Sequence, residues 1–184
     1  MKKILSIFLI VITFFSFSFS VFAADAKLSA DDVTIKAGET FDVVYKLSNN
    51  PGIMGFAFEF TFDSSALEVI SVKRCDDFIG GVFNDSINVN TTNDFKVIWT
   101  GTENYTNNCD LFLVTFKAKE SSNGKTYIEC RCSLDDTFNE KWEDVKIFAE
   151  TVQVNIEKSN SQSFWSRLVA WIKVIYNYLI SLFA

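Results

Sequence analysis

Four phenylalanines at alternate positions constrain the fold of this chain more than any other feature. Aromatic residues occupy the even-numbered positions, and small or polar residues the odd-numbered ones, in the run Phe56, Ala57, Phe58, Glu59, Phe60, Thr61 and Phe62. Side chains of a β-strand point alternately to opposite faces of its sheet. The run therefore predicts a strand with one aromatic face in a core and the other face turned outward.

The same period of two recurs along residues 27–157, and no amphipathic helix interrupts it. Leu111–Phe116 carries large apolar residues at both parities, which predicts a strand covered on both faces. Seven further candidate strands are separated by turns rich in Gly, Asn and Asp: Asp32–Lys36, Thr40–Leu47, Leu67–Lys73, Ser86–Asn90, Phe95–Thr100, Lys125–Ser133 and Lys146–Asn155. Short strands at this spacing predict an all-β sandwich or barrel with one core.

Charge and composition exclude several function classes. Histidine is absent from the 184 residues, which removes the commonest general base and most catalytic zinc sites. The net charge of −6 offers no basic surface to a phosphate backbone. We therefore expect no enzyme activity, no metal, no cofactor and no nucleic-acid partner.

The N-terminal segment has the features of a secretory signal. Lys2 and Lys3 precede an uncharged run from Ile4 to Phe22, and Val21-Phe22-Ala23 forms a small-x-small cleavage site. We expect residues 1–23 to be removed, with cleavage after Ala24 or Ala26 and an uncleaved anchor as the alternatives. The domain is then secreted, at the cell surface or membrane-associated.

The C-terminal segment predicts an amphipathic, mostly apolar helix after a polar linker at residues 158–163. Residues 164–184 contain no Asp or Glu, and one narrow stripe of polar or small residues recurs every three or four positions: Arg167, Ala170, Lys173, Asn177 and Ser181. Trp165 and Trp171 lie among the apolar residues. A helix of this length is about 31 Å long and could span a bilayer, but Lys173 would then lie near the middle of the membrane. We expect it to lie on a membrane surface or to bind another helix; spanning a membrane and docking on its own domain are the alternatives.

Several motifs together resemble the cohesin modules of bacterial cellulosomes and related cell-surface proteins. They are Val33-x-Ile35, Ala37-Gly38-Glu39-Thr40, the Phe41–Leu47 strand, Pro51–Val69, Val97-Ile98-Trp99 and Asp110–Ala118. The resemblance implies a nine-stranded jelly-roll sandwich akin in fold to carbohydrate-binding modules. It also implies a non-catalytic module that binds a dockerin-like protein in polysaccharide-degrading assemblies.

In that family the outward face of the strand that matches Gly55–Phe62 contacts the partner. The resemblance therefore implies a partner-binding set of outward residues on this strand and its neighbours: Gly55, Ala57, Glu59, Asn88, Asn90, Lys96 and Ile98. Most of these side chains are small or neutral, which favours apolar contact with a partner helix over ion pairing.

Four cysteines, at positions 75, 109, 130 and 132, permit disulfides in a secreted chain. The strand order of the resembled family implies that Cys75 lies beside Cys109, which makes this pair the first candidate. Cys130 and Cys132 share one face of a strand, and a direct bridge between them would be strained.

Trp142 leaves a second function class open. It lies in an acidic loop and is the candidate for stacking on a sugar ring, which would make the domain a carbohydrate-binding module that binds polysaccharide. Trp99 shares the parity of Phe95 and Val97 and is expected in the core. A third alternative is a structural surface component or adhesin anchored by its C-terminal helix.

Overall fold

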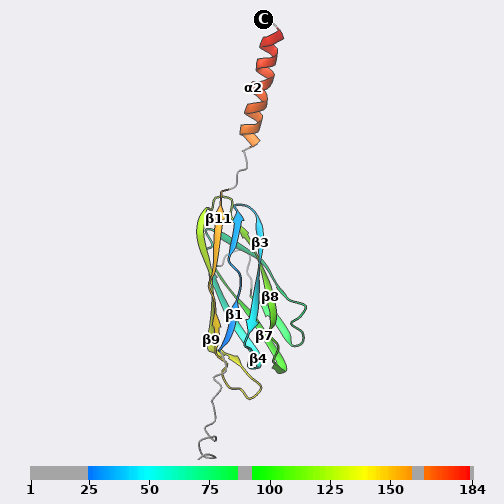
Figure 1. Cartoon of the computed structure of the whole chain (residues 1–184), viewed down its shortest axis with the longest axis vertical. Helices are drawn as coiled ribbons and strands as arrows, with labels where there is room; N and C mark the ends of the chain where they lie inside the picture. The colour runs from blue at the N-terminus through cyan, green and yellow to red at the C-terminus, as the bar shows by residue number, and fades with distance from the viewer. Residues whose placement is uncertain (1–24, 87–92, 159–163, 183–184) are drawn as a thin grey trace, which may run out of the picture.

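The computed structural model describes residues 25–86, 93–158 and 164–182, which form two packed β-sheets and one helix (Figure 1). The strands are β1 (Ala26–Ser29), β2 (Val33–Lys36), β3 (Thr40–Ser48), β4 (Ile53–Phe62), β5 (Leu67–Arg74), β6 (Val82–Asp85), β7 (Asp94–Tyr105), β8 (Cys109–Ala118), β9 (Gly124–Phe138), β10 (Ile147–Ala149) and β11 (Val152–Glu157). One sheet has the order β10-β1-β3-β8-β5 and the other β2-β11-β9-β4-β7-β6. The predicted all-β sandwich is confirmed.

Two of these strands are interrupted and pass from one sheet to the other. β1 and β2 are separated by residues 30–32, and β10 and β11 by residues 150–151. β1 pairs in parallel with β10, and β2 in parallel with β11. The Gln153 backbone N–H donates to Asp32 Oδ1 over 2.8 Å at the crossing. If each interrupted strand is counted once, the eleven described segments make nine strands, the number predicted for the jelly roll.

Aromatic rings from both sheets fill the space between them. Phe56, Phe58, Phe60 and Phe62 are all buried, whereas Ala57, Glu59 and Thr61 are partly exposed, as the alternation predicts. Phe112 lies at the centre of the rings, with centroids 5.2 Å from Tyr45 and 5.8 Å from Phe60. Burial of one such side chain stabilises a fold by roughly 1.5–3 kcal/mol. The core therefore holds β4 rigidly with its other face turned to solvent.

One detail of the predicted strands is only partly right. From Phe112 to Phe116, β8 is covered on one face: Phe112, Val114 and Phe116 are buried, but Leu113 and Thr115 are partly exposed, because no third layer of described residues covers them. Leu111, which was expected on the same face as Leu113, is buried. A strand at Val82–Asp85 was not among the predicted ones, and the strand expected over Ser86–Asn90 is not tested. Residues 87–90 lie outside the described part of the chain.

The C-terminal helix α2 spans Phe164–Leu182, as expected for this segment. Its exposed residues include Trp171, Val174, Tyr176 and Tyr178, and Lys173 is exposed too. Over the ranges that the structure describes, no helix has the length and apolar character needed to cross a bilayer. The side chains of Trp165 and Arg167, and the predicted signal segment 1–23, lie outside the described residues.

Candidate functional site

The outer face of the six-stranded sheet carries the candidate site. β6, β7, β4 and β9 lie side by side there, and their registers place outward residues in rows across the strands. The first row is Val82, Thr100, Gly55 and Phe138, and the second is Asn84, Ile98 and Ala57. The third row is Lys96, Glu59 and Arg131, and the fourth is Asp94, Thr61 and Glu129.

These rows divide the face into two halves of different chemistry. The first two rows form what we call the apolar half, in which Val82 is 64% and Ile98 40% exposed. The last two rows form the charged half, where Glu59 stands between Lys96 on one side and Arg131 on the other. Opposite charges on neighbouring strands stabilise a sheet by about 0.2–1 kcal/mol per pair. The face therefore presents apolar surface beside a row of charges of alternating sign.

A bulge in β9 interrupts the second row. Phe56 is the register partner of Thr137 and Phe58 that of Cys132, so Ala57 faces four residues, 133–136, instead of one. Extra residues in one strand bend it outward and break the local pairing. Asp135 and Asp136 are exposed on this bulge. Ala57 consequently has β7 on one side and a protruding acidic segment on the other.

Beyond the bulge, β9 ends in a tight hairpin that carries Trp142. The side chain of Asn139 organises this turn: its Oδ1 accepts from the N–H groups of Lys141 at 2.9 Å and Glu143 at 3.0 Å. Its Nδ2 donates to the Glu143 carboxylate over 2.9 Å. Trp142 adopts a φ of 62°, in the left-handed region, and its N–H donates to the Asn139 carbonyl over 3.0 Å. These bonds fix the backbone from which the indole projects.

The indole of Trp142 packs against a second aromatic ring. It is 73% exposed, and it stacks on Phe138 with ring centroids 5.0 Å apart and an interplanar angle of 14°. Phe138 in turn lies over Gly55 of β4, its register partner. The Glu140 N–H donates to Asn104 Oδ1 over 2.8 Å, which ties the hairpin to the end of β7. The outer face therefore ends in a rigid two-ring stack.

The structure brings together most of the predicted partner-binding residues. Ala57 and Ile98 are direct register partners, as are Glu59 and Lys96, and Gly55 lies one row further along. Asn88 and Asn90 lie outside the described residues; the β6 residue opposite Ile98 is Asn84.

The set predicted from the sequence lacks four residues of the apolar half: Val82, Asn84, Thr100 and Phe138. Val82 lies in none of the predicted strands, because its strand is short and follows two glycines. Phe138 was missed because the bulge in β9 breaks the alternation that would have placed it. Trp142 was identified as an exposed aromatic, and its exposure is confirmed; Trp99 is buried, as expected.

The four cysteines are free thiols and only partly exposed. The Cys75 N–H donates to the Leu111 carbonyl over 3.0 Å, which aligns Cys75 with the start of β8. Burial is the main cause of a raised pKa at Cys75, and the neighbouring Asp110 and Cys109 raise that pKa further. Cys130 and Cys132 both pack against the core, in keeping with their i, i+2 spacing.

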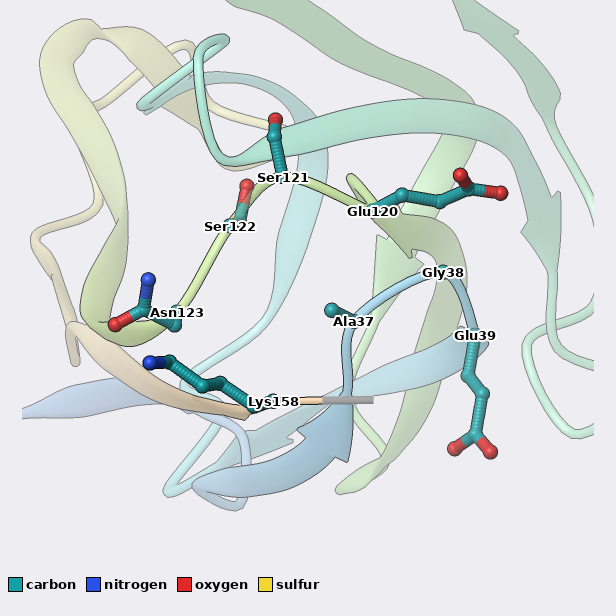
Figure 2. Close-up of a pocket in the computed structure, with 8 residues that line it drawn as sticks. All are labelled: Ala37, Gly38, Glu39, Glu120, Ser121, Ser122, Asn123 and Lys158. Atoms are coloured by element: carbon teal, nitrogen blue, oxygen red, sulfur yellow. The ribbon is translucent and has the colours of Figure 1, made fainter. Parts of the chain in front are cut away.

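A separate hollow lies between the turn at residues 37–39, the turn at residues 120–123 and Lys158. It has a volume of about 600 Å³. In Figure 2 the carboxylates of Glu39 and Glu120 extend away from each other, and Lys158 points toward Asn123. These polar groups do not converge on one position, as a small-ligand or catalytic site would require. Nor does the described part of the chain gather three or more residues suited to hold a metal ion.

Comparison with known proteins agrees with this architecture. The sequence model of the cohesin domain matches residues 26–161. No curated protein matches the chain.

Several solved structures share the fold. A non-cellulosomal cohesin from the archaeon Archaeoglobus fulgidus is 16% identical with a TM-score of 0.63, over 76% of this chain and 96% of that one. A cohesin from a type I cohesin–dockerin complex of Clostridium thermocellum is 20% identical with a TM-score of 0.63, over 73% and 95%. The sixth cohesin of Acetivibrio cellulolyticus scaffoldin B, solved with a Cel5 dockerin, is 23% identical with a TM-score of 0.60, over 73% and 100%. The match to the family over most of the chain, together with this sandwich, means that the protein belongs to the cohesin domain family.

Proposed function

We propose that this chain is a non-catalytic, extracellular binding module that engages a dockerin-like module of a partner protein through the outer face of its six-stranded sheet. The observation that carries the proposal is the apolar half, where Val82, Ile98 and Ala57 leave apolar surface exposed on rigid strands. Several solved cohesins of this fold are described in complex with dockerins, which supports the same class of partner.

The outer face is preorganised for binding. The inner faces of β4 and β7 are locked into the aromatic core, so binding orders little backbone on this side. Small side chains at Gly55 and Ala57 let a partner helix approach the sheet closely. The charged half, with Lys96, Glu59 and Arg131 in alternating sign, then favours one orientation of the partner over the others.

The test is direct binding to single dockerin modules. Each dockerin module encoded in the same genome is expressed alone, loaded with calcium and titrated against the full chain by biolayer interferometry. Ala57→Arg should weaken binding at least thirtyfold, because about 2 kcal/mol is typical of a disrupted central contact. Val44→Arg is the matched control, since Val44 is half-buried on the outer face of the opposite sheet.

Two results would contradict the proposal. If no dockerin binds, the partner class is wrong. If a dockerin binds and Ala57→Arg and Ile98→Arg leave its affinity unchanged, the face is wrong.

A second role, as a tether, is favoured by helix α2. Its apolar residues Trp171, Ile172 and Val174 are exposed, and residues 164–184 contain no acid. We propose that this helix lies in a membrane interface or binds another helix. In vesicle flotation with 30% anionic lipid, the full chain should float, and a chain ending at Lys158 should stay at the bottom.

Polysaccharide binding by the sandwich is the alternative favoured by the exposed indole of Trp142. It predicts retention of the full chain on soluble polysaccharide, and loss of that retention in Trp142→Ala. Failure of both dockerin and polysaccharide binding would leave an anchored surface spacer as the function.

A further inference from the structure

The structure points to a specific subsite on the partner interface: we infer that the free face of Trp142 receives a lysine or arginine side chain of the protein partner. The inference rests on the proposed function, because it places Trp142 at the end of the same interface. It adds a chemical requirement on the partner, which must present a basic residue where its contact with the apolar half ends.

Continuity with the apolar half is the first argument. Val82, Thr100, Gly55 and Phe138 form one row across four neighbouring strands. Four strands span roughly 14 Å at their usual spacing, which is close to the length of a helix of ten residues. Trp142 stacks on Phe138, so the indole stands at the Phe138 end of this row. A partner helix that follows the row therefore meets the indole there.

The shape of the stack is the second argument. One face of the indole is covered by Phe138, so a single aromatic face is left for a ligand. The two rings are stacked and not side by side, so they do not make the wider flat platform on which several sugar units could lie. One free aromatic face suits a single planar or compact group such as a guanidinium or ammonium.

Charge around the ring is the third argument. Between residues 135 and 144 there are five carboxylates and one lysine, a net charge of −4: Asp135, Asp136, Glu140, Lys141, Glu143 and Asp144. The negative face of an indole attracts a cation, and nearby carboxylates add to this attraction. An acidic partner segment would be repelled at the same place.

The position of the hairpin is consistent with a partner contact. Residue 157, where β11 ends, lies next to the start of β9, since Ile156 pairs with Gly124. The hairpin follows the other end of β9, and Figure 1 shows it at the opposite end of the sandwich from the helix. A chain tethered by α2 would therefore present Trp142 away from its anchor.

The experiment uses the full chain with tryptophan labelled by ¹⁵N, so that each indole N–H gives its own NMR signal. Trp142→Phe assigns the signal of Trp142. The probes are tetra-arginine amide, its neutral citrulline counterpart and cellohexaose. We expect only tetra-arginine to shift the Trp142 signal, and we expect the shift to fade as salt rises.

The same variants are then titrated with the dockerin modules. Trp142→Ala should weaken binding at least tenfold, and Trp142→Phe should retain most of the affinity. Trp171→Ala is the matched control, because Trp171 is 70% exposed on α2 and should leave the affinity unchanged.

The outcomes separate the two proposals. If Ala57→Arg weakens dockerin binding and Trp142→Ala does not, the inference is overturned and the proposed function stands. A shift of the Trp142 signal with cellohexaose but not with tetra-arginine overturns it in favour of a sugar site. If no dockerin binds, the proposed function fails. The tetra-arginine titration then decides about the basic subsite: a shift of the Trp142 signal supports it, and an unchanged signal overturns it.

Discussion

The ring of Phe138 stands where a side chain of residue 55 would lie. A Cβ atom built on Gly55 would fall 2.5 Å from Phe138 Cζ, closer than side chains approach each other. The backbone of Gly55 has an ordinary strand conformation, so conformation does not demand glycine at this position. Packing against Phe138 does. The other face of the Phe138 ring carries the stacked indole of Trp142.

Gly55→Ala tests this relationship. The added methyl must displace the Phe138 ring, which Trp142 covers from the other side, so we expect a loss of about 1–3 kcal/mol in the free energy of unfolding. Urea denaturation measures it. The double variant Gly55→Ala/Phe138→Ala removes the clash, and the two substitutions should then be clearly non-additive. Additive losses would show that the ring does not constrain position 55.

Phe112→Ala tests the core. Phe112 is fully buried among rings from both sheets, so its truncation should cost about 3–5 kcal/mol in unfolding free energy. Leu113→Ala is the matched control on the same strand, because Leu113 is partly exposed, and it should cost less than about 1 kcal/mol. Equal losses in the two variants would contradict the one-sided burial of β8.

Tyr105 makes stability depend on pH in the alkaline range. Its Oη lies 3.1 Å from the Asp77 carbonyl and 3.2 Å from Cys109 Sγ. Burial is the main cause that raises the pKa of Tyr105 from 10.0 to about 12. The unfolded chain therefore loses this proton first, and the stability it contributes is present below pH 10 and lost as pH rises toward 12.

Tyr105→Phe removes this titration. In guanidinium unfolding between pH 8 and pH 11, the stability of the native chain should fall more steeply above pH 10 than that of the variant. The raised thiol pKa of Cys75 adds a loss common to both proteins. Parallel curves above pH 10 would contradict the role of Tyr105.

The pairing of Cys75 with Cys109 stays a prediction. Both thiols are free in the structure, and Cys75 is aligned with the start of β8. After incubation with oxidised glutathione, peptide mass spectrometry should find a Cys75–Cys109 disulfide. Such a bond would stabilise the fold by about 2–4 kcal/mol, and Cys75→Ser should abolish the gain. Recovery of a Cys130–Cys132 bridge instead would refute the assignment.

Much of the fold could be predicted from local patterns. The alternation around Phe58 predicts a buried strand, because the faces of a strand follow from its own sequence. The parity of Phe95, Val97 and Trp99 predicts their burial in the same way. After residue 163 the chain has no Asp or Glu, and its polar residues fall on one side of a helix. This pattern predicts a helix, since it repeats with the helical period.

Other features depended on register between distant segments. Gly55 and Phe138 are far apart in the sequence, and their contact exists only because the bulge at residues 133–136 shifts the end of β9 against β4. The crossing of two interrupted strands between the sheets likewise appears only when the sandwich closes.

The sequence by itself determined which side chains of a regular strand such as β4 face the core and which face outward, because that is a property of the strand itself. The tertiary structure decided which outward residues are neighbours. It joined Val82, Ile98 and Ala57 into an apolar half and placed the Phe138–Trp142 stack at its edge. The physical reason is that pairing register is set by the packing of the whole core and by bulges, and a bulge leaves no periodic signal in the sequence.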